Sequence, residues 1–289
     1  MPKVDELAKE GGPLAIIAGG GTLPCAIAAA VTAGGGRVHI IGIRGEADET
    51  IASYPHSWMK WGEAGKLFAT LKQEGCHDLI FIGTVGRPDL SNIKLDLGAI
   101  RALPFLLSLR KGGDDSVLSR IVGFIEDKGY RVRGAGEVAP ELLAGIGTLG
   151  AKAPSTESMA DIEAGFRVVE ALGRLDVGQA AVVAKGHVLA VEAAEGTDAM
   201  LARCAGLRQW GGRTRAGVMV KAPKPGQEER VDLPTIGPDT VDKAAHAGLA
   251  GIAVAAGRVL IADRAATIAA ADEHGLFLFG QPQASTSDD

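Results

Sequence analysis

The segment from Lys221 to Gly237, KAPKPGQEERVDLPTIG, gathers side chains whose types suit phosphate chemistry. Cationic groups bind phosphate oxygens, and carboxylates can hold a metal ion or orient a water molecule. The cations are Lys221, Lys224 and Arg230, and the carboxylates are Glu228, Glu229 and Asp232. Prolines stiffen the segment and keep it from forming a helix. A solvated loop of mixed charge has the same composition, so this segment alone leaves both interpretations open.

A glycine-rich turn near the start of the chain is a second candidate for phosphate binding. The apolar run Leu14 to Ala18 predicts a strand, which leads through the sequence GGGT into an alanine-rich helical stretch. Glycines allow close backbone approach, and the first N–H groups of a helix attract anions. A plain strand-to-helix turn needs the same glycines, so the turn also leaves two interpretations open.

Two nucleotide-binding motifs are disfavoured at this turn. Pro24 stands where the third glycine of GxGxxG would be, and Arg44 instead of an acidic residue ends the second predicted strand. The chain also has no GxxxxGK[ST] sequence. Neither a nicotinamide-binding fingerprint nor a P-loop is therefore predicted.

Two further groups of candidates follow predicted strands or begin predicted helices. Gly83, Thr84 and Arg87 come after the strand predicted at His77 to Ile82, where α/β sheets commonly bind ligands. Thr197 and Asp198 begin a predicted helix, where they can cap the helix while its N–H groups hold an anion.

Other polar residues are predicted to be structural. Asp114 and Asp115 precede residues with helical spacing and are expected to cap that helix rather than bind metal. Ser158, followed by Asp161, resembles the start of another helix. The six histidines are scattered without the spacing of metal ligands.

The predicted elements form an α/β protein with two domains. Short apolar strands alternate with helices in the first half, which indicates a Rossmann-like parallel sheet. In the second half, two strands separated by Lys185 to His187 predict a hairpin, and alternating strands and helices follow it. We expect a flexible N-terminus at 1–12, a Rossmann-like domain at 13–145, a glycine-rich linker at 146–155, a catalytic α/β domain at 156–280 and a disordered tail at 281–289.

Composition and charge exclude several classes of protein. The 289 residues are 46% hydrophobic but only 4% aromatic, and the net charge of -5 carries no long basic block, so nucleic-acid binding is not expected. Three distant cysteines predict reduced thiols in a cytoplasmic protein. No apolar run reaches the roughly 20 residues of a membrane-spanning helix, and the N-terminus is too charged for a signal peptide.

An ordered set of motifs resembles a known family. The motifs are IIAGGGTLP, GTVGRP, GDDSVL, DVGQAAVV, VLAVEAAEGTDAM, KAPKPGQEERVDLPTIG and AGLAGIAVAAG. Together they cover nearly the whole chain and resemble the LpxI family, the UDP-2,3-diacylglucosamine pyrophosphatases of lipid A biosynthesis.

The resemblance implies a reaction and a cofactor. It implies hydrolysis of UDP-2,3-diacylglucosamine to UMP and 2,3-diacylglucosamine 1-phosphate (lipid X), with water attacking the β-phosphorus. It also implies a divalent cation, Mg²⁺ or Mn²⁺, and places the essential carboxylate of the DLPTIG segment at Asp232. Because a hard oxygen ligand suits Mg²⁺, we expect Asp232 to be both the catalytic residue and a metal ligand.

The remaining expectations concern substrate contacts, partners and alternatives. The candidate substrate-binding residues are Gly20, Gly21, Thr22, Gly83, Thr84, Arg87, Thr197, Asp198, Lys221, Lys224, Gln227, Arg230 and Thr235. Contact with the inner membrane would be peripheral, and a homodimer is expected only as the commonest assembly. A non-catalytic nucleotide-sugar or lipid binder and a nucleotide-dependent oxidoreductase are the alternatives.

Overall fold

A computed structural model describes residues 12–86, 96, 98, 114–207 and 215–282 of the chain, and for 114–116 it gives the backbone alone. The chain divides into two compact units. The first is Met1–Pro140 with Arg230–Asp232, and the second is Glu141–Glu229 with Leu233–Asp289. The division falls after Pro140, ahead of the range 146–155 expected as a linker, and that range contains a short strand of the second unit.

The first unit is built on a parallel sheet with strand order β3-β2-β1-β4-β5. The strands are β1 (Leu14–Ala18), β2 (Val38–Ile43), β3 (His56–Met59), β4 (Asp78–Ile82) and β5 (Arg131–Val132). Every residue of β1 and β2 is buried, which is why these strands lack the alternation of a half-exposed sheet. The predicted Rossmann-like sheet is confirmed, with β3 as an edge strand that the sequence did not indicate.

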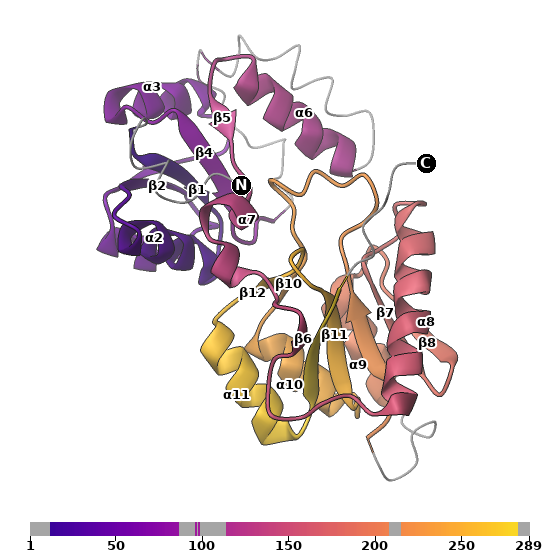
Figure 1. The fold of residues 1–289 in the computed structure, drawn as a ribbon. Coiled ribbons are helices and arrows are strands. Elements are labelled where there is room, and N and C mark those ends of the chain that lie inside the picture. Colours follow the sequence, from indigo (N-terminus) through magenta and orange to yellow (C-terminus); the bar gives the residue numbers. More distant parts are fainter. Residues whose placement is uncertain (1–11, 87–95, 97, 99–113, 208–214, 283–289) are drawn as a thin grey trace. The chain divides into compact units, whose positions relative to one another are not determined.

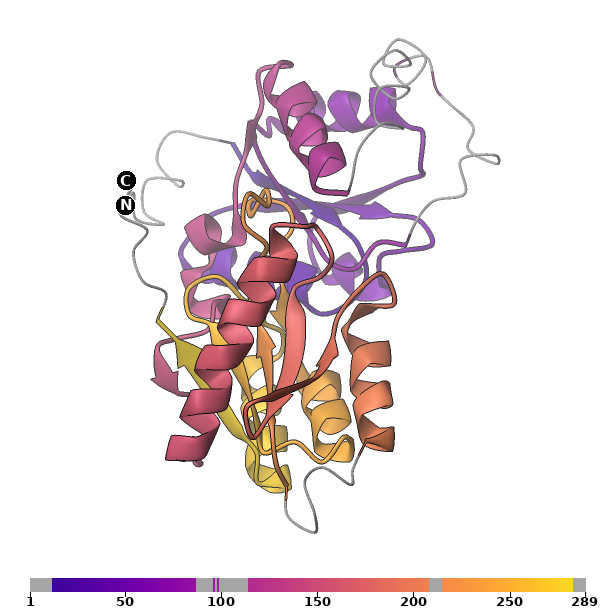
Figure 2. The same ribbon diagram turned by 90° about the vertical axis from the view of Figure 1, so that its right-hand side faces the viewer.

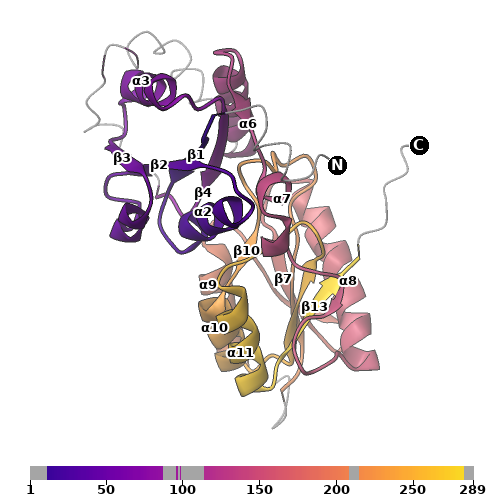
Figure 3. The same cartoon turned by 60° about the vertical axis from the view of Figure 1, so that its left-hand side comes forward.

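Helices cover both faces of this sheet. They are α2 (Leu23–Ala33), α3 (Ala64–Glu74), α6 (Asp114–Glu126) and the short α7 (Ala135–Val138). Short 3-10 turns lie at Glu49–Ser53 and at Pro140–Leu142, where the chain passes from the first unit to the second. Figures 1 and 3 show α2 and α7 on one face and α3 and α6 on the other. The core between sheet and helices includes Ile17, Leu71 and Leu79. Val231, far along the chain, packs against this same core.

The second unit has a mixed sheet with strand order β6-β13-β11-β9-β7-β8. Its strands are β6 (Gly147–Thr148), β7 (Ala180–Ala184), β8 (His187–Val191), β9 (Val218–Lys221), β11 (Gly251–Ala255) and β13 (Phe277–Gln281). Strands β9, β11 and β13 are parallel, whereas β7 runs antiparallel to β8 and β9. A separate parallel pair joins β10 (Thr235–Ile236) to β12 (Leu260–Ile261).

Four helices pack on this mixed sheet. They are α8 (Thr156–Gly173), α9 (Gly196–Gly206), α10 (Pro238–His246) and α11 (Arg264–His274). Figures 2 and 3 show α8 on one face and α9 and α10 on the other, where α11 also lies in Figure 3. None of the helices in the described residues is long and apolar enough to cross a membrane.

Local details correct some predictions. Helix α8 begins after Ser155, whose hydroxyl accepts a hydrogen bond from the Ser158 N–H, so Ser158 is inside the helix and Ser155 is its cap. Asp161 does not help to start the helix; it is buried, and its carboxylate accepts the N–H groups of Lys185 and Gly186 at 2.9 and 2.8 Å. It therefore stabilises the β7–β8 hairpin, in which His187 is the first residue of β8 rather than part of the turn.

Several expectations fall outside the described residues. These are the state of residues 1–11 and 283–289, and the capping role of the Asp114 and Asp115 side chains. The backbone of α6 does begin at Asp114, as predicted. Gln281, placed in the tail from sequence, is the last residue of β13.

Candidate active site

Asp232 lies in the loop that joins β9 to β10. Residues up to Glu229 belong to the second unit, Arg230–Asp232 belong to the first, and the chain returns to the second unit at Leu233. The Asp232 side chain is partly buried. The loop thus delivers the predicted catalytic carboxylate to the first unit.

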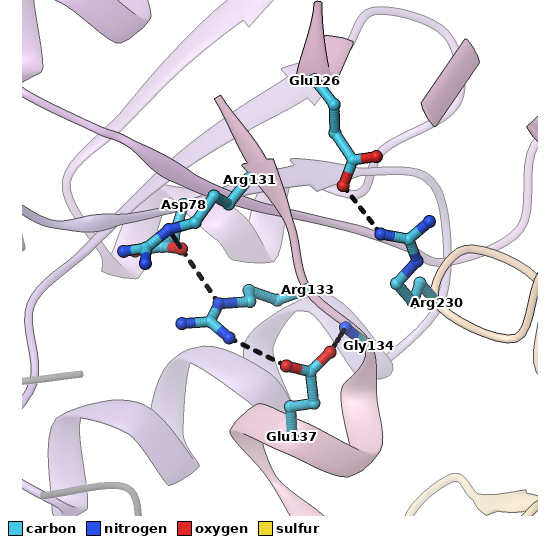
Figure 4. Close-up of polar contacts among 7 residues, drawn as sticks. All are labelled: Asp78, Glu126, Arg131, Arg133, Gly134, Glu137 and Arg230. Carbon is cyan, nitrogen blue, oxygen red and sulfur yellow. Dashed lines mark hydrogen bonds and ion pairs between the residues drawn. The ribbon is translucent and has the colours of Figure 1, made fainter. Parts of the chain in front are cut away.

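Neighbouring residues anchor this tripeptide to the first unit. Arg230 Nη1 lies 2.7 Å from Glu126 Oε1, which belongs to the last residue of α6 (Figure 4). Val231 packs against the apolar core of the first unit. A Cβ on Gly134 would lie 3.4 Å from the Arg230 Cα, in van der Waals contact, so the backbone after β5 passes close to the tripeptide. Asp232 therefore follows two residues that are held by an ion pair and by packing.

A network of charges stiffens the backbone around Gly134 (Figure 4). Asp78, which is 7% exposed, forms ion pairs with Arg131 and Arg133, and its Oδ1 lies 2.9 Å from Arg133 Nε. Arg133 Nη1 also lies 2.9 Å from Glu137 Oε2, while Glu137 Oε1 accepts the Gly134 N–H. Burial alone would lower the pKa of Arg133, but its hydrogen bonds and charge pairing with Asp78 and Glu137 raise it overall. The Arg133 guanidinium consequently stays charged, and its contacts link β4, β5 and α7.

The two glycine segments predicted to bind substrate come together at the carboxyl ends of β1 and β4. Gly20 and Thr84 exchange backbone hydrogen bonds of 2.8 and 2.9 Å. Gly83 has φ +102°, a conformation that glycine adopts without strain. Thr22 is at the N-cap position of α2, and its carbonyl accepts the Ala26 N–H at 3.0 Å. Parallel topology explains this meeting, because β1 and β4 are neighbours.

Acidic side chains already occupy N–H groups of these segments. Asp48 Oδ2 accepts the Gly21 N–H at 2.6 Å, and Glu46 Oε2 accepts the Gly86 N–H at 2.9 Å. A phosphate at Gly21 would have to displace the Asp48 carboxylate. Neither acid was among the predicted site residues, although their place just after β2 could have indicated them. Arg87 lies outside the described residues.

In the second unit, two predicted substrate-binding residues are in contact: Lys221 at the end of β9 and Thr197 in α9. Lys221 Nζ donates to Thr197 Oγ1 at 2.9 Å, and the Thr197 hydroxyl donates to Glu192 Oε1 at 2.8 Å. Lys221 and Glu192 are each only 6% exposed. Glu192 was not among the predicted site residues; its position directly after β8, five residues before Thr197, was the available signal.

Other candidates of the second unit have separate partners. Asp198 forms an exposed ion pair with Lys243, at 2.5 Å. Lys224 Nζ lies 2.5 Å from Asp176 Oδ1, and the Lys224 N–H donates to the side chain of buried Gln227 at 2.9 Å. These contacts hold the loop before Arg230 against the turn that follows α8.

Two further contacts shape the same loop. The Thr235 hydroxyl donates to the Leu233 carbonyl at 3.3 Å, just before β10. Glu229 forms an ion pair with Arg258. Both ends of the loop therefore have partners in the second unit.

The arrangement of acidic residues bears on metal binding. Among the described residues, no group of three or more His, Cys, Asp or Glu side chains is placed to hold a metal ion. Mg²⁺ usually keeps several waters and binds through one or two carboxylates together with substrate phosphates. A single carboxylate at Asp232 fits that mode of binding.

Comparison with known proteins gives three consistent matches. The LpxI N-terminal domain matches residues 13–142, and the LpxI C-terminal domain matches residues 145–279. A protein of Caulobacter vibrioides named UDP-2,3-diacylglucosamine pyrophosphatase LpxI is 48% identical over 270 residues, which cover 92% of this chain and 96% of the relative.

Proposed function

Because the chain belongs to the LpxI family, we propose that it is a hydrolase that cleaves the pyrophosphate of UDP-2,3-diacylglucosamine in lipid A biosynthesis. The observation that carries this proposal is the 48% identity to a pyrophosphatase of that name across 92% of the chain. The products are UMP and 2,3-diacylglucosamine 1-phosphate. Water attacks the β-phosphorus, its oxygen joins the lipid product, and the bridging oxygen leaves with UMP.

Asp232 is proposed as the catalytic carboxylate and as a ligand of Mg²⁺ or Mn²⁺. When bound, the cation would offset negative charge that develops on the pyrophosphate. The Asp232 carboxylate would be held in a defined position, because the two residues before it are fixed: Arg230 pairs with Glu126, and Val231 packs against the core of the first unit. These contacts support the assignment, since catalytic groups need supported positions.

The cations of the loop are proposed to contact the phosphates. Lys224 and Arg230 are partly exposed and already paired with Asp176 and Glu126, so a phosphate would share or replace a carboxylate partner. Lys221 is buried beside Thr197 and contributes a more rigidly held positive charge. Charge on the transferred phosphoryl group is stabilised best by donors that do not reorganise.

Substitution of Asp232 tests the proposal. Asp232→Ala should lower UMP release from UDP-2,3-diacylglucosamine by at least about 10³-fold, because several kcal/mol of charge stabilisation are lost. Asp239→Ala is the matched control, since Asp239 is an exposed acid seven residues away in the first turn of α10. Circular dichroism should show that both variants are folded. Near-normal hydrolysis by folded Asp232→Ala would contradict the catalytic assignment.

Labelled water tests which phosphorus is attacked. With H₂¹⁸O, one turnover should place ¹⁸O in 2,3-diacylglucosamine 1-phosphate and none in UMP, as measured by mass spectrometry. Label in UMP would mean that the α-phosphorus is attacked instead.

Location and assembly are part of the same proposal. The enzyme is cytoplasmic and touches the inner membrane peripherally, because a diacylated substrate is drawn from a lipid surface. Sedimentation with vesicles that contain the substrate tests this contact. A homodimer is proposed only as the commonest assembly, and light scattering of the purified protein measures it.

A further inference from the structure

In the second unit, Lys221 is one end of a buried chain of polar groups whose other end, Glu192, has no role in the proposed chemistry. It runs from the Lys221 ammonium through the Thr197 hydroxyl to the Glu192 carboxylate, with distances of 2.9 and 2.8 Å. Burial of a charged group is costly unless it has polar partners, and both charged members are only 6% exposed. Such a chain is therefore expected to be kept for a purpose other than stability.

The direction of the hydrogen bonds is determined by chemistry. An ammonium group only donates and an ionised carboxylate only accepts. The Thr197 hydroxyl has a single proton, which goes to Glu192, so its lone pairs face Lys221. Glu192 thus orients the Thr197 hydroxyl, and the hydroxyl in turn orients the Lys221 ammonium.

The backbone holds Glu192 rigidly. Its N–H donates to the Ala180 carbonyl at 2.8 Å directly after β8, and its Oε2 accepts the Gln179 N–H at 3.4 Å. A Cβ on Gly178 would lie only 2.1 Å from the Glu192 carbonyl oxygen, which shows how closely the two backbones approach. Lys221 ends β9 and pairs with Ala180 of β7, the residue whose carbonyl accepts the Glu192 N–H, so Lys221 and Glu192 lie at the same end of neighbouring strands.

We propose that Glu192 is a positioning residue of the pyrophosphatase: through Thr197 it holds the Lys221 ammonium in the orientation that stabilises charge on the pyrophosphate. This inference rests on the proposed function. Glu192 does not contact the substrate; it acts through Thr197 on Lys221. The proposed role of Lys221 therefore depends on an acid that lies outside the segment 221–237 in the sequence.

Substitutions that keep shape and change one bond test the proposal. Thr197→Val removes the hydroxyl and should lower kcat by about 10- to 100-fold with little change in KM, because a transition-state contact loses its orientation. Thr197→Ser keeps the hydroxyl and should stay within about 3-fold of the wild type. Glu192→Gln removes the charge and should resemble Thr197→Val.

Glu195→Gln is the matched control. Glu195 lies three residues after Glu192 and forms an ion pair with Arg203 outside the buried chain. The same change of acid to amide there should leave kcat and KM within about 2-fold of the wild type. If Glu192→Gln behaves like Glu195→Gln while remaining folded, the proposal is overturned.

A double substitution shows whether the residues act as one unit. Glu192→Gln combined with Thr197→Val should be no more than about 3-fold worse than the poorer single variant, because both break the same chain. If the kcat losses of the two single variants multiply in the double variant, the two residues act independently and the proposed chain is overturned.

A second measurement separates this inference from the proposed function. The ¹⁵N-labelled Lys221 ammonium should give a slowly exchanging signal in the wild type and in Glu195→Gln, assigned by its absence in Lys221→Met. The signal should disappear in Thr197→Val and Glu192→Gln. A wild type that releases no UMP overturns the proposed function; an active wild type whose Lys221 signal and kcat are unchanged in Glu192→Gln overturns only the present inference.

Discussion

Buried acids in this protein have partners that differ in kind. Asp78 is neutralised by two arginines, Asp161 accepts two backbone N–H groups of a hairpin, and Glu192 accepts a hydroxyl and a backbone N–H. An unpaired buried carboxylate would be strongly destabilising, so each acid marks a place where the fold depends on polar contacts. Two of these acids stabilise turns or strand ends, and the third connects to the proposed site.

The buried side chain of His39 should make the stability of the fold depend on pH. Burial lowers the pKa of His39, more than the nearby Glu74 raises it. The unfolded chain therefore binds a proton more readily than the folded protein, and stability is lost as pH falls below about 6.5 until the lowered folded pKa is passed. In the fold, His39 Nε2 lies 3.1 Å from Ser57 Oγ.

Chemical denaturation checks this dependence. The free energy of unfolding of the wild type should fall more between pH 7.5 and pH 5 than that of His39→Gln, which cannot gain the proton. Equal changes in the two proteins would show that His39 is not responsible.

At the element scale, the ends of β1 and β4 are joined by backbone contacts instead of side chains. Gly20 pairs with Thr84, and Gly83 lies so close to them that a Cβ there would be 2.7 Å from the Gly20 carbonyl oxygen. The ends of β1 and β4 thus converge on a turn whose backbone favours glycine at position 83. This backbone contact positions the candidate residues Gly20, Gly83 and Thr84 whatever ligand they bind.

Glycine substitutions at two positions should have opposite effects. Gly83→Ala should destabilise the protein by about 2 kcal/mol or more, because its positive φ and the short contact both oppose a side chain. Gly123→Ala in α6, where a Cβ meets nothing within 4 Å, should stabilise by about 0.5–1 kcal/mol. Urea unfolding measures both, and a neutral Gly83→Ala would contradict the close approach.

At the scale of the whole molecule, each of the two α/β units has a separate hydrophobic core. The β9–β10 loop contributes residues to both units: residues 230–232 belong to the first unit and the rest of the loop to the second. The proposed catalytic residue thus lies on the loop that begins directly after Lys221, the last residue of β9. Neither core uses a metal cluster within the described residues.

Metal removal should therefore separate activity from folding. Chelation with EDTA should abolish UMP release, and added Mg²⁺ should restore it, because the cation is proposed to act on the pyrophosphate. The Tm should stay within about 2 °C, since structural metal sites contribute to folding but a weakly held catalytic Mg²⁺ does not. A large drop in Tm on chelation would indicate a structural metal instead.

Local signals in the sequence were sufficient for most elements and for the fold class. Buried strands such as Leu14–Ala18, helices such as Ala64–Glu74 and the turn at Lys185 and Gly186 follow from apolar runs, periodicity and turn residues. The edge strand β3 was missed because its residues HSWM carry no apolar run, and β6 and β10 because two residues carry no period. The resemblance of the motifs also identified the family, which the domain matches confirm.

The sequence by itself determined the family, the two α/β units and the loop that holds Asp232. Only the tertiary structure decided the partner of each charge: Arg230 with Glu126, 104 residues away, and Lys224 with Asp176, 48 residues away. It also revealed Glu192, whose carboxylate is linked to Lys221 through the Thr197 hydroxyl because β8, β7 and β9 are adjacent. The physical reason is that secondary structure follows from neighbours along the chain, whereas ion pairs form between side chains that folding brings within a few ångströms.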